Sequence, residues 1–322
     1  MGPSKRVLTL AAQCVTAQRR IKDAILPTPC IKSRADLPEN TSLYLKTENL
    51  QYTGSFKLRG AMSKLTTLAT DTPVITASSG NHGIACSHAA MTTGHNLTVV
   101  LPENVTRTKL SAIQRYGTQT ILHPGDSGQA EQHAQSLAAN GEYVYVSPYN
   151  DPMVMAGQGS IALELLEQLQ QIDNVFVSMG GGGLISGIGS VLKAFSPGIN
   201  IIGVSATNSA ALAASIEKGH VVETTHLQTL ADGCAGGVDD NALTLPIATE
   251  VIDRVIYCSE DQIANALRTI AWTDNMIVEG AAALALAGYL ADIDAYIGQA
   301  SVIVLCGANY DQKVIQPIIG SV

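Results

Sequence analysis

Residues 48–61 read ENLQYTGSFKLRGA and place a single lysine, Lys57, directly after a Thr-Gly-Ser turn. The spacing predicts a helix that runs to about Ala69, with Ser55 as its N-cap. Its apolar face would comprise Leu58, Ala61, Met62, Leu65 and Leu68. The positive end of the helix dipole and burial behind Phe56 both disfavour the charged form of Lys57, so we expect its pKa to be lowered. A neutral amine is the form that reacts with a carbonyl group, which makes this lysine a candidate for covalent catalysis.

The composition favours a globular enzyme-sized protein over a nucleic-acid or membrane protein. The 322 residues are 46% apolar and only 14% charged, with a net charge of −8 and no basic run. Such a chain has ample length to bury a core, and the small charged fraction makes a homodimer reasonable. An acidic chain without a basic block offers no surface for nucleic acid.

Cysteine usage and the apolar segments indicate a cytoplasmic setting. No CxxC pair occurs among Cys14, Cys30, Cys86, Cys234, Cys258 and Cys306. Scattered cysteines in a chain of this size are typical of reduced thiols. The first five residues lead into an amphipathic helix, so we expect no signal segment. The alanine-rich run 280–290 is too short to span a bilayer and is interpreted as a buried helix.

Two blocks of alternating strand-like and helix-like runs predict an α/β fold with parallel sheets. The first block extends from Pro73 to Val146 and the second from Asn174 to Cys306. Residues 150–159 are expected to be a joint, with a helix beginning at Gly159. The segment 219–238 has no clear period, and long loops of this kind are often functional.

A loop of small and polar residues, Ser78-Ser79-Gly80-Asn81-His82-Gly83, lies between a predicted strand and a predicted helix. Ligands of open α/β sheets bind at this end of the strands, and backbone N–H groups at a helix N-terminus suit a carboxylate. Asn81 could bond a ring hydroxyl, and Ser79 could transfer a proton. The alternative is an ordinary glycine-containing turn.

Four consecutive glycines, residues 180–183, follow another predicted strand and precede Leu184 at the start of a helix. Bare amides in such a turn can surround a phosphate. The Walker A pattern fails because Gly187 is followed by Ile188-Gly189, and the dinucleotide pattern GxGxxG fails at Ile185. A phosphate other than that of a nucleoside triphosphate or a dinucleotide is therefore predicted, and a packing turn is the alternative.

The remaining candidates are weaker. Cys306 ends the last strand at the same sheet edge, where a neutral thiol could face a heterocyclic nitrogen or could simply be a buried structural cysteine. His82, Cys86 and His88 lack the spacing of metal ligands, so no metal is expected. No GxSxG motif occurs, which leaves a hydrolase without a nucleophile.

Taken in order, ENLQYTGSFKLRGA, TASSGNHGIA, YNDPMVMAGQGS, SMGGGGLISGIG and LCGAN resemble the fold-type II pyridoxal-phosphate enzymes, in particular the serine/threonine dehydratase (ammonia-lyase) and serine racemase group. The resemblance covers nearly the whole chain. It implies a two-domain architecture like that of tryptophan synthase β, with parallel-rich sheets and helices on both faces. Residues 1–52 and 150–322 would form the large cofactor-binding domain and residues 53–149 the small substrate-loop domain, with Lys57 at the junction.

The resemblance also implies roles for individual residues. Lys57 would hold pyridoxal 5'-phosphate as a Schiff base, and Ser79 would be the second catalytic residue. The cofactor would further contact Phe56, Asn81, Gly180, Gly181, Gly182, Gly183, Leu184, Gly233, Glu279 and Cys306. The substrate carboxylate would lie against Ser78, Ser79, Gly80, Asn81 and His82.

Three departures from the group narrow these expectations. The segment 205–211 has no carboxylate where metal-binding members carry acidic residues, which argues against that divalent-metal site. An arginine used by some relatives is absent around residues 126–129, which disfavours a dicarboxylic substrate. The chain ends soon after Asn309, so no regulatory domain is expected.

The function expected from the resemblance is β-elimination on a 3-hydroxy amino acid such as L-threonine or L-serine, which yields a 2-oxo acid and ammonia. Racemisation through Ser79, dehydration of a bulkier or acidic 3-hydroxy amino acid, β-replacement by an added nucleophile, and a non-catalytic binding protein stay open as alternatives. The expected partner is a small amino acid.

Overall fold

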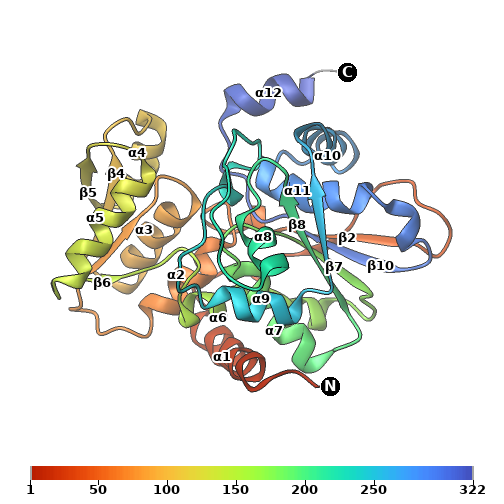
Figure 1. The fold of residues 1–322 in the computed structure, drawn as a ribbon, viewed down its shortest axis with the longest axis horizontal. Coiled ribbons are helices and arrows are strands. Elements are labelled where there is room, and N and C mark those ends of the chain that lie inside the picture. Colours follow the sequence, from red (N-terminus) through yellow and green to blue (C-terminus); the bar gives the residue numbers. More distant parts are fainter. Residues whose placement is uncertain (1, 321–322) are drawn as a thin grey trace.

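The computed structural model describes residues 2–320, and the larger of its sheets has six strands (Figure 1). All neighbouring strands of this sheet are parallel except the first pair, which is antiparallel. The strand order is β1 (Cys30–Lys32), β2 (Ser42–Lys46), β10 (Ala300–Val304), β7 (Asn174–Ser178), β8 (Asn200–Ala206) and β9 (Arg254–Cys258).

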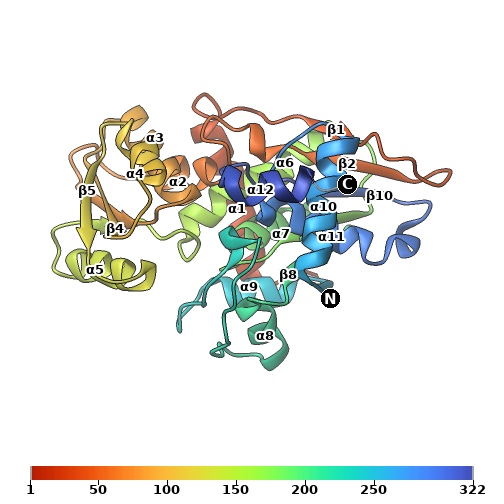
Figure 2. The ribbon, with the colours of Figure 1, turned by 90° about the horizontal axis from the view of Figure 1, so that it is seen from above.

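A separate four-stranded sheet is built from the middle of the chain and lies at one end of the molecule (Figures 1 and 2). Its strands are all parallel, in the order β5 (Gln119–His123), β4 (Leu97–Pro102), β3 (Val74–Ala77) and β6 (Val144–Tyr145). The expected α/β class with parallel-rich sheets is confirmed. The division of the chain into domains at residues 53 and 149 stays a prediction.

Helices cover both faces of the small sheet because successive strand residues point to opposite sides. Val74 and Val99 pack in one cluster with Ile84 of α3 (Asn81–Thr93). Ile75 and Val100 pack with α5 (Ser127–Ala139) on the other face. Helix α4 (Arg107–Gln114) joins the α3 side through Ile113.

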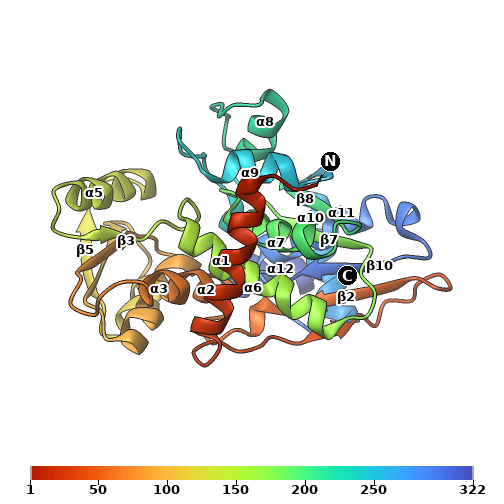
Figure 3. The ribbon, with the colours of Figure 1, turned by 90° about the horizontal axis from the view of Figure 1, so that it is seen from below.

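The large sheet is likewise enclosed between two helical layers. Figure 3 shows α1 (Lys5–Ile21) crossing one layer, which also contains α6 (Pro152–Gln168), α7 (Gly183–Phe195) and α9 (Thr244–Val251). The other layer holds α10 (Glu260–Thr273) and α11 (Gly280–Leu290), with α12 (Gln312–Gly320) packed on α10 (Figure 1). Helix α8 (Ala211–Lys218) packs beside α9. Within residues 2–320, no helix is both long and apolar enough to cross a membrane.

The lysine helix differs from its prediction at both ends. Helix α2 begins at Lys57 and ends at Leu65, four residues before the expected end. Its N-cap is Phe56, and Ser55 is not a cap: its backbone pairs with Gly307, while its buried hydroxyl has no hydrogen-bond partner among the described residues. The backbone of Ser55 is thus used in a bridge to Gly307, and the helix begins after it.

The expected joint at 150–159 was wrong because α6 begins there. The carboxylate of Asp151 accepts hydrogen bonds from the N–H groups of Met153 and Val154, and Pro152 occupies the first helical position. Proline and an aspartate cap are a strong start signal for a helix. The short helix α9, helix α12 and strand β1 were not predicted at all.

Candidate active site

Lys57 projects from the first turn of α2 into a buried space. Its Nζ donates a hydrogen bond to the carbonyl of Pro148 at 2.7 Å and lies 5.2 Å from the centre of the Phe56 ring. Burial lowers the pKa of Lys57, as expected from its sequence position. The titratable groups that act on this amine are His82, Cys86, Glu131, Cys234, Glu279 and Cys306.

The turn before Lys57 is fixed to the end of strand β10 by backbone pairing. The Phe56 N–H donates to the Cys306 carbonyl at 3.0 Å, and the Ala308 N–H donates to the Gly54 carbonyl at 2.8 Å. Gly54 has a φ of +73°, a conformation that favours glycine. This pairing brings two motifs that are 250 residues apart in the sequence to one place.

The tetraglycine turn between β7 and α7 leaves its amides free. Within residues 2–320, no hydrogen bond uses the N–H of Gly180, Gly181 or Gly182. A Cβ on Gly181 would lie 2.4 Å from the Tyr149 ring, so that ring closes one side of the turn. The Thr244 hydroxyl donates to the Gly181 carbonyl at 2.7 Å and orients the peptide. Free amides at the start of a 13-residue helix form an anion-binding concavity.

The loop after β3 forms a second set of free amides. Helix α3 begins at Asn81, and the hydrogen bond from Ile84 N–H to the Gly80 carbonyl is the first of this helix. Gly83 has no room for a side chain, because a Cβ would lie 1.9 Å from the Ser78 carbonyl oxygen. The His82 ring contacts the Val146 carbonyl at 3.0 Å, and burial lowers its pKa to about 3. What His82 offers to this loop is therefore its backbone N–H.

Glu279 joins the loops of the two sheets. Its carboxylate accepts hydrogen bonds from the Asn81 side-chain amide at 2.8 and 3.1 Å and from the Asn309 N–H at 3.1 Å. The Cys306 thiol lies 3.9 Å from the same carboxylate. Burial raises the pKa of Glu279 to about 7, and burial next to Glu279 raises the pKa of Cys306 well above its usual value. The Cys306 thiol is consequently uncharged at neutral pH.

The other predicted residues take up specific places around this centre. Gly233 lies in a short 3-10 helix beside Glu279, where a Cβ would be 3.5 Å from the carboxylate. The next residue, Cys234, contacts Gly180, where a Cβ would lie 3.1 Å from the Cys234 Cα. Ser79 is half-buried in its loop, and in the described part of the chain its hydroxyl makes no hydrogen bond.

Sequence reasoning missed the residues that follow strand β6. Pro148 binds the Lys57 amine, and Tyr149 lies against the tetraglycine turn. The Asn150 side chain donates a hydrogen bond to Asp239 at 2.8 Å and so connects this segment to the end of the long loop 219–238. No local sequence pattern marks these residues: they reach the site because β6 pairs in parallel with β3, which places the residues after β6 at the same sheet edge as the loop 78–82.

A family model described as "Pyridoxal-phosphate dependent enzyme" matches residues 21–307. The catabolic L-threonine dehydratase TdcB of Escherichia coli is 37% identical over 286 residues, which cover 87% of this chain and 86% of that protein. The L-threonine ammonia-lyase of Thermotoga maritima is 35% identical over 94% of this chain and 76% of its own length.

Solved structures are similar over nearly the whole chain. The processed form of threonine deaminase isoform 2 from Solanum lycopersicum has a TM-score of 0.90 at 29% identity, covering 99% of this chain and 94% of that one. Maize serine racemase has a TM-score of 0.87 at 29% identity, covering 95% of each chain.

Proposed function

The chain belongs to the pyridoxal-phosphate-dependent enzyme family, and from that premise we propose that it is a lyase that eliminates water from a 3-hydroxy amino acid such as L-threonine or L-serine and, after water adds back, releases a 2-oxo acid and ammonia. The observation that carries the proposal is the Lys57 amine, whose pKa is lowered by burial, beside free glycine amides and a neutral thiol. Relatives named as an L-threonine dehydratase, at 37% identity, and an L-threonine ammonia-lyase, at 35%, support the same reaction class.

The residues around Lys57 fit pyridoxal 5'-phosphate. Lys57 offers an amine of lowered pKa, which suits a carbonyl carbon. The free amides of Gly180, Gly181 and Gly182 suit a phosphate, and only glycine leaves this space open next to Tyr149. Cys306 offers an uncharged thiol, so it neither donates positive charge nor adds negative charge at a ring nitrogen.

Two groups of the chain would act on the substrate. When bound, the cofactor makes negative charge on the Cα of an amino acid less costly. The Lys57 amine, whose pKa is lowered by burial, accepts the Cα proton. The free N–H groups of Asn81, His82 and Gly83 bind the substrate carboxylate. Loss of the Cβ hydroxyl followed by addition of water then gives a 2-oxo acid and ammonia.

Racemisation is a second candidate because the Ser79 hydroxyl is left without a hydrogen-bond partner in the described chain. A free hydroxyl in the substrate loop can return a proton to Cα from the side opposite Lys57. The structural similarity to maize serine racemase also favours this activity as a companion of elimination. Both reactions would use the same bound substrate.

The test is a panel of L- and D-amino acids with 3-hydroxyl groups, scored for 2-oxo acid and ammonia released by the full-length chain supplied with pyridoxal 5'-phosphate. We expect equal amounts of the two products from threonine or serine, and none from Lys57→Ala. Lys64→Ala is the matched control, because Lys64 pairs with Asp151 at the other end of α2 and should keep its activity. Normal turnover by Lys57→Ala, or no release from any amino acid, would contradict the proposal.

We also propose a homodimer. Trp272 and Ile277 are large apolar side chains that are 67% and 46% exposed near the end of α10. A second copy of the chain would cover them. Light scattering of the purified chain measures the mass directly, and a monomeric mass at micromolar concentration would contradict this proposal.

A cytoplasmic location is proposed from the cysteines. All six are free thiols in the structure, five of them buried. Free thiols persist in a reducing compartment. Fractionation of the native host with detection of the chain would test the location.

A further inference from the structure

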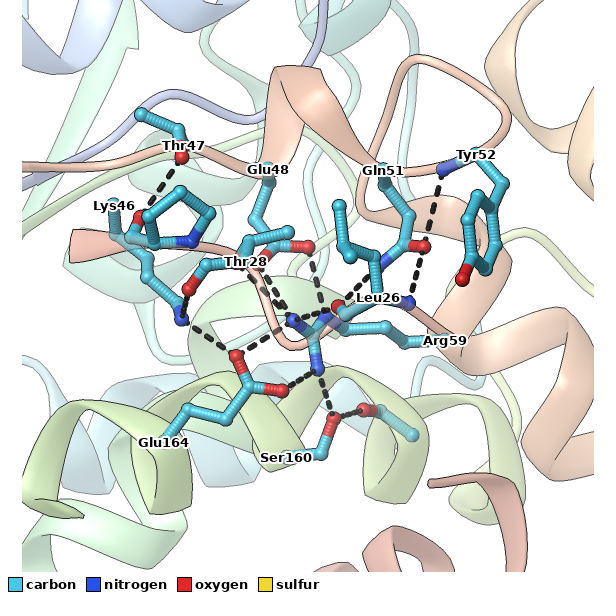
Figure 4. Close-up of polar contacts among 12 residues, drawn as sticks. Leu26, Thr28, Lys46, Thr47, Glu48, Gln51, Tyr52, Arg59, Ser160 and Glu164 are labelled. Carbon is cyan, nitrogen blue, oxygen red and sulfur yellow. Dashed lines mark hydrogen bonds and ion pairs between the residues drawn. The ribbon is translucent and has the colours of Figure 1, made fainter. Parts of the chain in front are cut away.

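Arg59, two residues after Lys57, is a fully buried cation held between two carboxylates (Figure 4). Its Nε and Nη2 donate to the Glu48 carboxylate at 2.8 Å each. Its Nη1 and Nη2 donate to the Glu164 carboxylate at 2.6 and 2.9 Å, and Nη1 also donates to the Ser160 hydroxyl at 3.0 Å. Every N–H of the guanidinium therefore has an acceptor, and both carboxylates are bound in the bidentate geometry that only arginine offers.

A second buried cation completes the cluster. Lys46 Nζ donates to Glu164 at 2.5 Å, to the Thr28 carbonyl at 2.6 Å and to Gln168 at 3.0 Å. The Thr28 hydroxyl donates to Glu48 in a short hydrogen bond. Two cations and two carboxylates cancel in charge, so the cluster has no net charge, and none of its members is among the charges that shift the pKa of Lys57. We therefore look to geometry for its effect on the lysine.

The cluster fixes α2 to elements on the side of the large sheet. Lys46 ends strand β2, Glu48 begins the 3-10 helix η1 (Glu48–Leu50), and Glu164 lies in α6. Arg59 is the member contributed by α2. Burying four charges is costly and rarely the best way to gain stability, whereas a fully bonded buried cluster does define one geometry. The cluster is therefore better suited to setting the position of α2 than to stabilising the fold.

Helices α2 and α6 are also in backbone contact next to Arg59. A Cβ on Gly157 of α6 would lie 2.3 Å from the Arg59 carbonyl oxygen. On the other side of Lys57, the Phe56 N–H is bonded to the Cys306 carbonyl. Lys57 thus stands between two anchors, of which one is backbone pairing and the other is the Arg59 cluster.

We propose that Arg59 is a positioning residue: with Glu48 and Glu164 it sets the first turn of α2, so that the Lys57 amine keeps its buried place at the Pro148 carbonyl. This inference rests on the proposed function, because it assigns Lys57 as the residue that reacts with the cofactor. Without the guanidinium fork, the first turn of α2 shifts and the amine moves toward water.

The test compares Arg59→Lys with Arg20→Lys. The Arg59 substitution keeps the charge but removes the planar fork. Arg20 anchors the opposite end of α2, where it donates to Thr66 at 2.9 Å and to the Ser63 carbonyl at 3.0 Å, so it is the matched control. Each full-length protein, freed of cofactor, is mixed with pyridoxal 5'-phosphate at a series of pH values, reduced with borohydride, and scored by peptide mass for label on Lys57.

We expect the pH midpoint of labelling to rise by about one unit in Arg59→Lys, because an amine nearer to water regains its charge. At neutral pH this lowers the labelling rate about tenfold. The midpoint of Arg20→Lys should equal that of the wild type. A purely structural role would lower the melting temperature of both variants without moving either midpoint.

An unchanged midpoint in folded Arg59→Lys would overturn the inference, as would an equal shift in Arg20→Lys. If Arg59→Lys does not fold, Glu164→Gln is measured in the same way, since it keeps the Arg59–Glu48 pair; a midpoint equal to that of the wild type would again overturn the inference. A wild-type protein that takes no label on Lys57 would instead remove the proposed function, so the two failures are distinguishable.

Discussion

Asn81, the first residue of helix α3 beside the small sheet, donates its side-chain amide to both oxygens of Glu279, which precedes helix α11 beside the large sheet, at 2.8 and 3.1 Å. This bond links the loop that we propose for the substrate carboxylate to the residues that we propose for the cofactor. Because Glu279 is buried, its pKa is raised to about 7, so the charge of the link changes near neutral pH.

The first prediction concerns the effect of Glu279 on stability. Its pKa rises from 4.5 in the unfolded chain to about 7 in the fold, so the folded protein binds the extra proton between these values. The contribution of this group is complete below about pH 4.5 and is lost as the pH rises through 7. Relative to Glu279→Gln, the cofactor-free wild type should lose about 2–3 kcal/mol of unfolding free energy between pH 5 and pH 8.

Urea unfolding of both proteins at the two pH values measures this difference. Comparing the change with pH cancels any fixed misfit of the glutamine amide. A difference between the two proteins that is independent of pH would show that Glu279 keeps an ordinary pKa.

The second prediction separates elimination from racemisation. Ser79→Ala removes a half-buried hydroxyl without changing Lys57. We expect exchange between serine enantiomers to fall at least tenfold, about 1.4 kcal/mol in barrier height, while ammonia release from L-serine stays within a few-fold of the wild type. Chiral chromatography and an ammonia assay on one sample give both rates. Equal losses in the two reactions would show that Ser79 binds substrate in both.

The third prediction tests the tetraglycine turn. In Gly181→Ala the new methyl would meet the Tyr149 ring at 2.4 Å, and relief of this overlap costs about 1–3 kcal/mol. Pyridoxal 5'-phosphate should then bind about tenfold or more weakly, as measured by fluorescence titration. Gly198→Ala is the control, because a Cβ there has no neighbour within 4 Å. Equal affinity in both variants would mean that the phosphate does not use this turn.

How much of the site could be predicted depended on whether a residue lies within a recognisable local pattern. Lys57, the tetraglycine turn and the loop 78–82 each combine glycine with a strand or helix boundary, and all three were predicted as parts of the site from the sequence. Tyr149 was missed because its role comes from the pairing of β6 with β3, which no local pattern encodes. The start of helix α6 was predicted too late, because residues 150–159 were interpreted as a joint although Asp151 and Pro152 form a helix start signal.

The buried cluster of charged residues around Arg59 could likewise not be predicted from a local sequence pattern. Lys46, Glu48 and Arg59 lie close together in the sequence, but charged residues are almost always exposed unless paired. Their partner Glu164 comes from a helix more than a hundred residues later. Burial of the cluster is therefore a consequence of how α2 crosses α6, and the sequence pattern alone does not reveal it.

The fourth prediction tests the close contact where α2 crosses α6. In Gly157→Ala the methyl would meet the Arg59 carbonyl oxygen at 2.3 Å, and backbone on both helices must separate to admit it. We expect a loss of about 3 kcal/mol in unfolding free energy, at the upper end of the range for overpacked sites.

The neighbouring Gly60→Ala is the matched comparison, because its methyl meets at 2.3 Å only the end of the flexible Gln158 side chain and next the Val154 methyl at 2.8 Å. Alanine gains about 1 kcal/mol over glycine within a helix at both positions, so the difference between the two variants reports the crowding alone. We therefore expect urea unfolding to give a clearly lower unfolding free energy for Gly157→Ala than for Gly60→Ala. The slope of the free energy against urea concentration should be the same in both variants. The reverse order would mean that α2 and α6 are free to move apart, and that the Arg59 cluster does not hold them at a fixed distance.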